Sequence, residues 1–398
     1  MNKNIENNEK SEDNEQIENN KIKLHEKIKN IVMVMIFVAI IGAIFLASVL
    51  TPSIEISMSE RRHLAQWPDF NWERALGGDF FDDFEDYIKD QFFQRDFFRA
   101  ISALAKFNLF RLNDNNGIFV IDGAVYSMDF PLNENNIVRA ANRFNRVYER
   151  YFADGDFNVF YSVIPDKNYF VRERRDTLTY DYNRLLELMH ENVSDSIRYI
   201  DIFDTLTIED YYRTDLHWRQ DKLSPVVERL LNAKGRVYTR PTHTHNTMYP
   251  FRGSYFGQAA IPLRPDTLSF MTNETINNAR AFIHSVTAAH GQRRLEIPIY
   301  DVDAFYGVDP FNLFLGGPQM IVEIENPTNP DGGELIIFRD SFGSSLAPML
   351  IEHYSRIILI DMRYIRYDLY ERFVSFTPGS DVLFMLNTQI LNHSVMLQ

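Results

Sequence analysis

The longest apolar stretch of the chain runs from Ile31 to Leu50, twenty residues without a charged side chain. A helix of about 20 residues is about 30 Å long, which matches the hydrocarbon thickness of a membrane. The pattern therefore predicts a transmembrane anchor over residues 31–50. A cleaved signal peptide is the alternative, although its apolar core is usually shorter and Ala47-Ser48 makes a weak cleavage site.

The charges that flank this stretch predict its orientation. Four lysines precede it: Lys21, Lys23, Lys27 and Lys29. The ten residues after it carry Glu55 and Glu60 and no basic side chain. Positive charge is retained on the cytoplasmic side, so we expect a single-pass cell-membrane protein with a cytoplasmic N-terminus and the bulk of the chain outside the cell. Residues 1–30, rich in Asn, Glu and Lys, are expected to form a disordered cytoplasmic tail.

Residues 51–110 are predicted to be a stalk and a helical lead-in. Residues 51–75 contain two prolines and no clear periodicity, whereas apolar residues recur at helical spacing between Phe80 and Phe110 and predict two helices. The next pattern is a β-hairpin over Ile118–Met128, because Asp122-Gly123 separates two short apolar runs.

From residue 111 onward, apolar runs typical of buried strands alternate with amphipathic helical patterns. The predicted strands are Asn158–Ile164, Arg198–Phe203, Leu335–Phe338, Arg356–Ile360 and Val382–Leu386, and the clearest predicted helices are Ile137–Tyr151 and Tyr182–Asn192. This alternation favours an α/β domain over residues 111–398, with a mainly parallel sheet flanked by helices. Residues 240–332, rich in Pro, Gly, Asn and Thr, are expected to form an irregular insertion.

Ser341 follows one of these strands closely. Leu335–Phe338 is continuously apolar, and Ser344 and Pro348 fit the N-cap and first turn of a following helix. A strand-to-helix turn lifts a hydroxyl out of the sheet, at the end of the strand where parallel sheets gather their reacting groups. We therefore predict that Ser341 is a nucleophile.

Asp215 and His217 are two residues apart, so in an extended segment their side chains point the same way. A serine nucleophile needs a base, and a histidine base needs a carboxylate that holds its tautomer. Together the three residues predict a Ser341–His217–Asp215 triad. The alternative is that His217, next to Trp218, has a structural role only.

Other polar residues are weaker candidates. His243 and His245 have a spacing that metal sites use, but no acidic or histidine partner is evident nearby, so we expect no metal and no cofactor. Ser254 follows no apolar strand and is expected to border the cleft. Asp166 and Lys167 lie beyond a strand end and are interpreted as a salt-bridged surface pair.

Composition excludes several classes of function. The net charge of −14 argues against nucleic acid as a partner. The absence of cysteine excludes a thiol nucleophile and a disulfide framework. The chain has 32 Phe and 20 Tyr, which suit surfaces that stack on sugars and suit ordinary packing equally well.

Thr-Asp-Leu-His-Trp at residues 214–218, followed by Arg-Asp-Ser-Phe-Gly at residues 339–343, resembles the DHHW family of Gram-positive membrane-anchored proteins. That family is grouped with the SGNH-hydrolase-like acetyltransferases of alginate O-acetylation. Further segments carry the same resemblance: Ser59–Ala65, Asp69–Phe98, Ser254–Gly257, Asp361–Tyr364 and Val382–Asn387. Leu216 stands where the family name places its first histidine.

The resemblance implies an SGNH-type fold and an extracytoplasmic O-acetyltransferase that modifies cell-envelope or secreted polysaccharide through an acyl-enzyme on Ser341. It also implies a membrane-bound O-acyltransferase as the partner that supplies the acyl donor. A carbohydrate esterase and a non-catalytic polysaccharide-binding or assembly module are the alternatives.

Candidates for contact with the substrate lie near the predicted nucleophile. The N–H groups of residues 341–343 are expected to hold the oxyanion. Arg339 and Asn387, at strand ends, and Tyr255, in a predicted cleft loop, are the candidate substrate-binding side chains. The alternatives are that Arg339 lies on the far side of its strand end and that Tyr255 is a packed aromatic.

Overall fold

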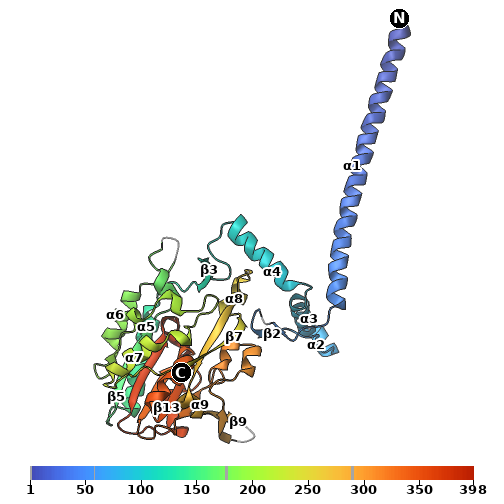
Figure 1. Ribbon diagram of the computed structural model, residues 1–398. Coiled ribbons are helices and arrows are strands. Elements are labelled where there is room, and N and C mark those ends of the chain that lie inside the picture. Colours follow the sequence, from blue (N-terminus) through green and yellow to red (C-terminus); the bar gives the residue numbers. More distant parts are fainter. Residues whose placement is uncertain (1, 58, 175–177, 288–290) are drawn as a thin grey trace. The chain divides into compact units, whose positions relative to one another are not determined.

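The structure is a computed structural model that describes residues 2–57, 59–174, 178–287 and 291–398 (Figure 1). Contacts within the chain group it into two compact units. The first comprises Met1–Glu55 and His63–Phe97, and the second comprises Ile56–Arg62 and Phe98–Gln398. The second unit therefore contains the predicted α/β domain together with a short segment of the predicted stalk.

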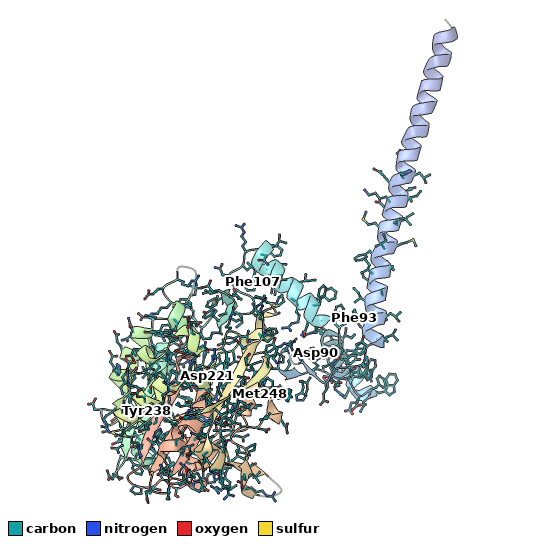
Figure 2. All side chains as sticks on the ribbon, viewed as in Figure 1. Asp90, Phe93, Phe107, Asp221, Tyr238 and Met248 are labelled. Atoms are coloured by element: carbon teal, nitrogen blue, oxygen red, sulfur yellow. The ribbon has the colours of Figure 1, made fainter. Side chains whose placement is uncertain are left out.

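The first unit contains one long helix, α1 (Asn2–Leu50). Within it, Lys23–Leu50 is long and apolar enough to cross a membrane, by length and composition, as a signal sequence also would be. Figure 2 shows the side chains of this stretch projecting outward on all sides. Most of the large apolar side chains from Ile31 to Leu50 are more than half exposed. An apolar helix of this kind would be buried in the core of a water-soluble protein, so the predicted membrane-spanning length is confirmed.

The first 30 residues differ from the expected disordered tail, because α1 begins at Asn2. Glu, Lys and Gln are good helix formers, and a helix that the apolar stretch has already nucleated extends at little further cost. The low apolar content of this segment therefore excludes a packed core but does not exclude a helix.

Three helices follow in the lead-in: α2 (Trp72–Gly77), α3 (Asp79–Asp90) and α4 (Arg95–Leu104). The last two are the predicted pair. The first was not expected in the irregular stalk, and its start is fixed by Asn71, whose side chain accepts a hydrogen bond from the N–H of Glu73. The stalk also contains two strands of two residues each, β1 (Ile56–Ser57) and β2 (Arg62–His63).

The second unit is organised around an eight-stranded sheet with the order β10-β9-β11-β13-β12-β14-β5-β6. The strands from β13 to β6 in that order run parallel to their neighbours, whereas β11, β9 and β10 extend one edge in antiparallel pairing. The bounds are β5 (Asn158–Ile164), β6 (Arg198–Tyr199), β9 (Arg280–Thr287), β10 (Gly291–Ile297), β11 (Ile321–Glu325), β12 (Glu334–Arg339), β13 (Arg356–Asp361) and β14 (Asp381–Asn387). The expected α/β class with a mainly parallel sheet is confirmed.

Helices cover both faces of this sheet. The helices are α5 (Glu134–Tyr151) and α6 (Tyr182–Asn192) on one face and α7 (Ser224–Ala233) and α10 (Phe342–Leu350) on the other. The side chains of strand β12 alternate between the two faces. Ile336 and Phe338 pack in the core on the side of α5 and α6, and Leu335 and Ile337 pack in the core on the side of α7 and α10. Successive side chains of a strand point to opposite faces, so a strand covered on both sides is apolar throughout.

The strongest sequence patterns are confirmed almost to the residue. Strand β5 and helix α6 have the predicted bounds, and the predicted hairpin consists of β3 (Ile118–Ile121) and β4 (Ala124–Ser127). Its turn residues Asp122 and Gly123 have φ values of 50° and 73°, as a two-residue type I′ turn requires. The predicted strand at residues 198–203 is shorter than expected, because β6 ends at Tyr199.

Residues 240–332 are more regular than the expected irregular insertion. They form a separate two-stranded sheet, two short helices and three strands of the main sheet: β7 (Thr244–Phe251), β8 (Asp266–Thr272), α8 (Ser254–Ala259), α9 (Glu274–Asn278), β9, β10 and β11. Strand β10 carries exposed Arg293, Arg294 and Glu296. Antiparallel strands at a sheet edge need no continuous apolar run, so the apolar pattern could not reveal them.

Candidate active site

The structure brings Ser341, His217 and Asp215 together in the second unit. Ser341 Oγ lies 2.7 Å from His217 Nε2, and His217 Nδ1 lies 2.6 Å from Asp215 Oδ1. The three side chains form one hydrogen-bonded series although 124 residues separate the histidine from the serine. In such a series the imidazole can accept the serine proton while the carboxylate holds the other ring nitrogen.

Asp215 is fully buried and is held from three sides. Its Oδ1 also accepts a hydrogen bond from the backbone N–H of His217 at 2.9 Å, and its Oδ2 accepts one from the N–H of Ser254 at 2.7 Å. Arg61 Nη1 lies 3.3 Å from the same Oδ2. Burial alone would raise the pKa of Asp215, but the charges and hydrogen bonds of His217 and Arg61 hold that pKa well below its ordinary value. The carboxylate is therefore ionised and fixed in orientation.

Arg61 links this carboxylate to a distant part of the chain. It lies 154 residues before Asp215 and also forms an ion pair with Asp309. Burial lowers the pKa of Arg61, and the charge of Asp215 raises it in turn. Because both partners are acidic, the guanidinium neutralises charge that would otherwise accumulate beside the triad.

The loop that carries Asp215 is held by Lys167. Its Nζ donates to four backbone carbonyls: Val125 at 2.6 Å, Tyr212 at 2.8 Å, Arg213 at 3.0 Å and Asp215 at 3.1 Å. Burial lowers the pKa of Lys167 to about 7, and the charges of Asp215 and Asp266 oppose that shift. One amine thus satisfies most of the carbonyls of residues 212–215 and fixes the path of the backbone.

The interpretation of Asp166 and Lys167 as a salt-bridged surface pair is wrong. Both are buried, and Asp166 instead accepts hydrogen bonds from the hydroxyls of Tyr180, Tyr182 and Thr388. The strand end at β5 turns these side chains inward, where the carbonyls of residues 212–215 and the tyrosine hydroxyls need partners.

Replacing Lys167 by methionine is expected to lower the free energy of unfolding by about 3–5 kcal/mol, because it leaves several buried carbonyls without a donor. Urea-induced unfolding of the variant and the parent chain measures this loss. Lys222→Met is the matched control, because Lys222 is exposed and its replacement should change the free energy by less than about 0.5 kcal/mol. A loss below about 1 kcal/mol for Lys167→Met would contradict the role of the amine.

Ser341 directly precedes α10, with φ −63° and ψ −22°. One residue, Asp340, separates it from the end of β12. The Asp340 carboxylate accepts the N–H of Phe342 at 3.0 Å, in the first turn of the helix, and the N–H of Asn387 at 2.7 Å, at the end of β14. The turn that presents the serine is therefore tied to the neighbouring strand.

The start of this helix differs from the prediction. Ser344 and Pro348 lie inside α10 rather than at its N-cap and first turn. The Asp340 carboxylate satisfies the first turn, so the helix begins at Phe342, two residues before the predicted cap. The serine consequently sits at the N-terminal end of the helix itself, where the helix dipole is positive.

The imidazole of His217 is enclosed by aromatic rings. Phe311, in the short 3-10 helix Pro310–Leu313, stacks on it with ring centroids 3.7 Å apart and an interplanar angle of 6°. Phe342 lies on a tilted plane with its ring centroid 4.8 Å away. These contacts fix the plane of the ring and keep water from its faces, so that its hydrogen bonds run along the triad.

A cavity of about 390 Å³ opens beside Ser341 and His217. Its wall contains Leu216, Ser254, Asn312, Ser344, Arg363 and Tyr364. The mixture of hydroxyl, amide, guanidinium and aromatic groups suits a polar ligand that carries a small apolar group. Tyr364 is 49% exposed and therefore offers a ring at the edge of the cavity.

A family model described as the DHHW protein matches residues 168–360. The chain carries a DHHW segment. This segment includes Asp215, His217 and Ser341, and the resemblance expected from the sequence is confirmed. No curated protein matches the chain in sequence.

Two solved proteins, one of them in two structures, share a fold with this chain. A DHHW family protein from Eubacterium siraeum is 22% identical, and the match covers 70% of this chain and 93% of that chain with a TM-score of 0.54. Bacillus cereus PatB1 is 15% identical, over 71% of this chain and 97% of that chain, with a TM-score of 0.55. A PatB1 structure with a sulfonyl adduct gives a TM-score of 0.54 at 15% identity, over 69% of this chain and 97% of that chain.

The O-acetyltransferase domain of Pseudomonas putida AlgJ is 12% identical over 69% of this chain and 92% of that chain, and its TM-score of 0.39 is too low to support an inference. The other likenesses show a common fold. The expected α/β architecture is therefore shared with the DHHW family protein and with PatB1.

Leu216 occupies the position at which the name of the DHHW family places its first histidine. Its side chain lies in the wall of the cavity. Its apolar side chain packs on both the core around Trp218 and the small cluster around Tyr255. Of the described residues that line the cavity, His217 alone contributes an imidazole. A histidine base in this cavity would therefore be His217.

The candidate substrate-binding side chains have other positions. Tyr255, Arg339 and Asn387 are all buried, and none of them is among the described residues that line the cavity. Tyr255 packs on the hairpin and donates to Gln389 at 3.2 Å. Arg339 lies 3.4 Å from the carboxylate of Asp361. Each of these side chains has a partner inside the protein, and a role in substrate binding stays a prediction.

Asn387 has a structural position at the end of β14. Its Oδ1 caps the short helix α11 (Thr388–Asn392) by accepting the N–H of Gln389 at 3.0 Å, and its Nδ2 donates to the carbonyl of Ile164 at 3.3 Å. The amide therefore joins two neighbouring strand ends, which explains an asparagine here without any contact to substrate.

Two of the three expected oxyanion donors are already engaged. The N–H of Phe342 donates to the Asp340 carboxylate, and the N–H of Gly343 donates to the Asp340 carbonyl at 3.2 Å. The backbone N–H of Ser341 is the remaining one of the three expected donors. The Ser254 hydroxyl is buried in the cavity wall and has no hydrogen-bond partner among the described residues, so it is a further polar group within the same space.

The alternative candidates do not form a second site. His243 Nε2 lies 2.6 Å from Glu352, and the described part of the chain contains no group of three or more His, Cys, Asp or Glu side chains placed to hold a metal ion. Ser254 borders the cavity, as expected, but the structure pairs no histidine with it.

Sequence reasoning missed several residues of the site. Arg61, Phe311 and Asp309 gave no local pattern, because each depends on contacts between distant segments. A signal was present for three of the residues in the cavity or beside it: Arg61, Arg363 and Tyr364 all lie in segments that carry the DHHW resemblance. The segments that carry the family resemblance outside the triad therefore contribute side chains to the same site.

Proposed function

We propose that the second unit is a serine O-acyltransferase that moves acetyl groups onto hydroxyls of a cell-envelope or secreted polysaccharide. The observation that carries this proposal is the hydrogen-bonded series from Ser341 through His217 to Asp215, which opens on a cavity with polar and aromatic walls. The match of residues 168–360 to the DHHW family supports it.

In the first step, Ser341 Oγ attacks the carbonyl carbon of an acetyl ester while His217 Nε2 takes its proton. The tetrahedral intermediate then collapses, and His217 returns the proton to the departing oxygen of the donor. The acetyl group is left as an ester on Ser341. Asp215 keeps Nδ1 protonated throughout, so that Nε2 is the basic nitrogen.

In the second step, a sugar hydroxyl replaces the departed donor. His217 removes its proton, the oxygen attacks the acetyl ester, and Ser341 leaves with the proton that His217 returns. The product is an O-acetylated sugar and the free enzyme. If water enters instead, the product is acetate and the protein is an esterase, because the same residues serve both reactions.

The membrane helix suits this chemistry. With α1 as a single-pass anchor and its N-terminus in the cytoplasm, the second unit would work outside the cell, where acetyl donors must be delivered across the membrane. We therefore include a membrane-bound O-acyltransferase in the proposal as the partner that supplies the acyl group.

A sulfonyl fluoride reagent tests the nucleophile directly, because it forms a stable ester with an activated serine. After treatment of the full chain in detergent, mass spectrometry of the peptides is expected to find one sulfonyl group on Ser341. Labelling should disappear in Ser341→Ala, fall strongly in His217→Ala and persist in Ser254→Ala. An adduct that persists in Ser341→Ala would exclude Ser341 as the reactive group.

A donor and acceptor assay separates the three functions. The chain is incubated with 4-nitrophenyl acetate and a neutral oligosaccharide, and products are followed by mass spectrometry. Acetylated oligosaccharide supports the transferase, and acetate release that is independent of the oligosaccharide supports the esterase. Retention of the oligosaccharide without turnover in either assay would favour a non-catalytic binding module.

A further inference from the structure

Within the first unit, the segment after α1 exposes large apolar side chains. Trp67, Phe70, Trp72, Leu76 and Phe81 have exposed fractions of 63%, 58%, 72%, 86% and 61%. Neither α2 nor α3 has a buried residue. A patch of this size and aromatic content is unusual for a surface in contact with water and indicates a partner of apolar character.

Helix α3 divides its side chains between two faces. At 3.6 residues per turn, one face carries the apolar and aromatic residues: Phe80, Phe81, Phe84, Tyr87 and Ile88. The opposite face carries the acidic residues: Asp79, Asp82, Asp83, Glu85, Asp86 and Asp90. A helix with one apolar face and one charged face, free of a buried core, has the pattern of a helix that lies in a membrane interface.

The apolar face of α3 borders a cavity of about 660 Å³ beside the end of α1. Ile41 and Phe45 of α1, together with Trp67, Phe84, Ile88 and Phe92, form most of its wall. Trp67 packs edge-on against Phe84, with ring centroids 5.5 Å apart. The volume is enough for several methylene groups, and its wall is mainly hydrocarbon.

Two polar side chains in this wall, Ser48 and Gln91, have partners within the first unit. Ser48 Oγ accepts the N–H of Phe93 at 3.1 Å. Gln91 Nε2 donates to the carbonyls of Ile54 and Ala65 at 2.9 and 3.0 Å. The cavity therefore presents few polar groups that would hold water, and an apolar occupant fits it better.

The cavity lies at the end of the stretch that can span a membrane. The bond from Phe93 to Ser48 places the chain after α3 beside the last turn of α1 (Figure 2), and Ile41 and Phe45 belong to the spanning stretch Lys23–Leu50. If that stretch lies in the membrane, the apolar face of α3 lies at the boundary between headgroups and acyl chains.

We propose that acyl chains of membrane lipids fill this cavity and that residues 67–92 lie in the membrane interface, with the acidic face of α3 toward water. This proposal rests on the membrane anchorage included in the proposed function. Tryptophan is favoured at that depth because its ring is apolar and its N–H is polar. The acidic face of α3 is not attracted to anionic lipids. Contact of residues 67–92 with the membrane should therefore come from insertion of apolar side chains, and it should not depend on the salt concentration.

Tryptophan fluorescence tests the proposal, because the chain has three tryptophans and Trp218 is fully buried in the second unit. The full chain is reconstituted in phosphatidylcholine vesicles, with or without bromine on the acyl chains near the headgroup. The expected result is a loss of emission in the brominated vesicles that does not change when the salt concentration is raised.

Two sets of variants make the result specific. Trp67→Phe combined with Trp72→Phe should remove the effect of bromine. Phe84→Glu combined with Ile88→Glu should also remove it and expose the tryptophans to iodide in the water. Equal emission in both kinds of vesicle, with strong quenching by iodide in the parent chain, would overturn the proposal.

Two further measurements distinguish failure of the lipid proposal from failure of the proposed acyl-transfer function. Resistance to alkaline carbonate extraction reports whether α1 is inserted, and release of the chain by carbonate would overturn both anchorage and lipid contact. Sulfonyl labelling of Ser341 reports the triad alone. Retained labelling together with absent bromine quenching would therefore reject the lipid site and leave the proposed chemistry standing.

Discussion

Replacing Ser341 by alanine is expected to lower turnover of 4-nitrophenyl acetate about a million-fold, the effect that loss of the nucleophile has in a known serine hydrolase. The hydroxyl lies 2.7 Å from His217 Nε2, and no acyl-enzyme can form without it. The measurement is kcat in the steady state, with the burst of nitrophenol as a second readout of the acyl-enzyme.

Ser196→Ala is the control for this change, because Ser196 is exposed and distant in sequence from the triad. Its turnover should match that of the parent chain. A loss of less than about tenfold in Ser341→Ala would contradict a nucleophilic serine, since even one triad member normally contributes far more.

Replacing Asp215 by asparagine is expected to lower turnover about ten-thousand-fold with little change in KM, because the amide cannot hold His217 in the tautomer that leaves Nε2 basic. The carboxylate Oδ1 accepts both the ring N–H and the backbone N–H of His217. The substitution keeps the shape of the side chain and removes its charge, which also leaves Arg61 with one fewer anionic partner.

The comparison for this variant is Asp303→Asn, an exposed carboxylate in the second unit, whose loss should leave turnover unchanged. Thermal unfolding of both variants separates loss of chemistry from loss of fold. A stable Asp215→Asn protein with more than about a tenth of the parent activity would show that the stack on Phe311 alone orients the imidazole.

The parts of this fold that could be predicted from sequence are those whose signal is local. Strands β5, β12, β13 and β14 are covered on both faces, so each is mainly apolar. The pair Asp215 and His217 was recognisable because two polar groups of complementary chemistry share one short segment, and Ser341 because it closely follows such a strand. These patterns need no knowledge of the distant chain.

The parts that escaped prediction depend on neighbours that are far away in sequence. Arg339 looked accessible at a strand end, but it is buried against Asp361 on the adjacent strand. Lys167 looked like a surface charge, but it satisfies carbonyls of a loop more than 40 residues away. A charged side chain at the end of a strand therefore gives no information on exposure until its neighbours are known.

The position of Arg61 has a consequence for how the protein can be shortened. Residues 56–62 belong to the second unit although they precede the helices of the lead-in. A soluble fragment cut after residue 62, or a form shed from the cell by a protease acting there, would retain all three triad residues and still lack the guanidinium beside Asp215. Recombinant fragments intended to test the proposed activity should therefore begin before Ile56, and shedding in that region would release a form in which Asp215 lacks this cation.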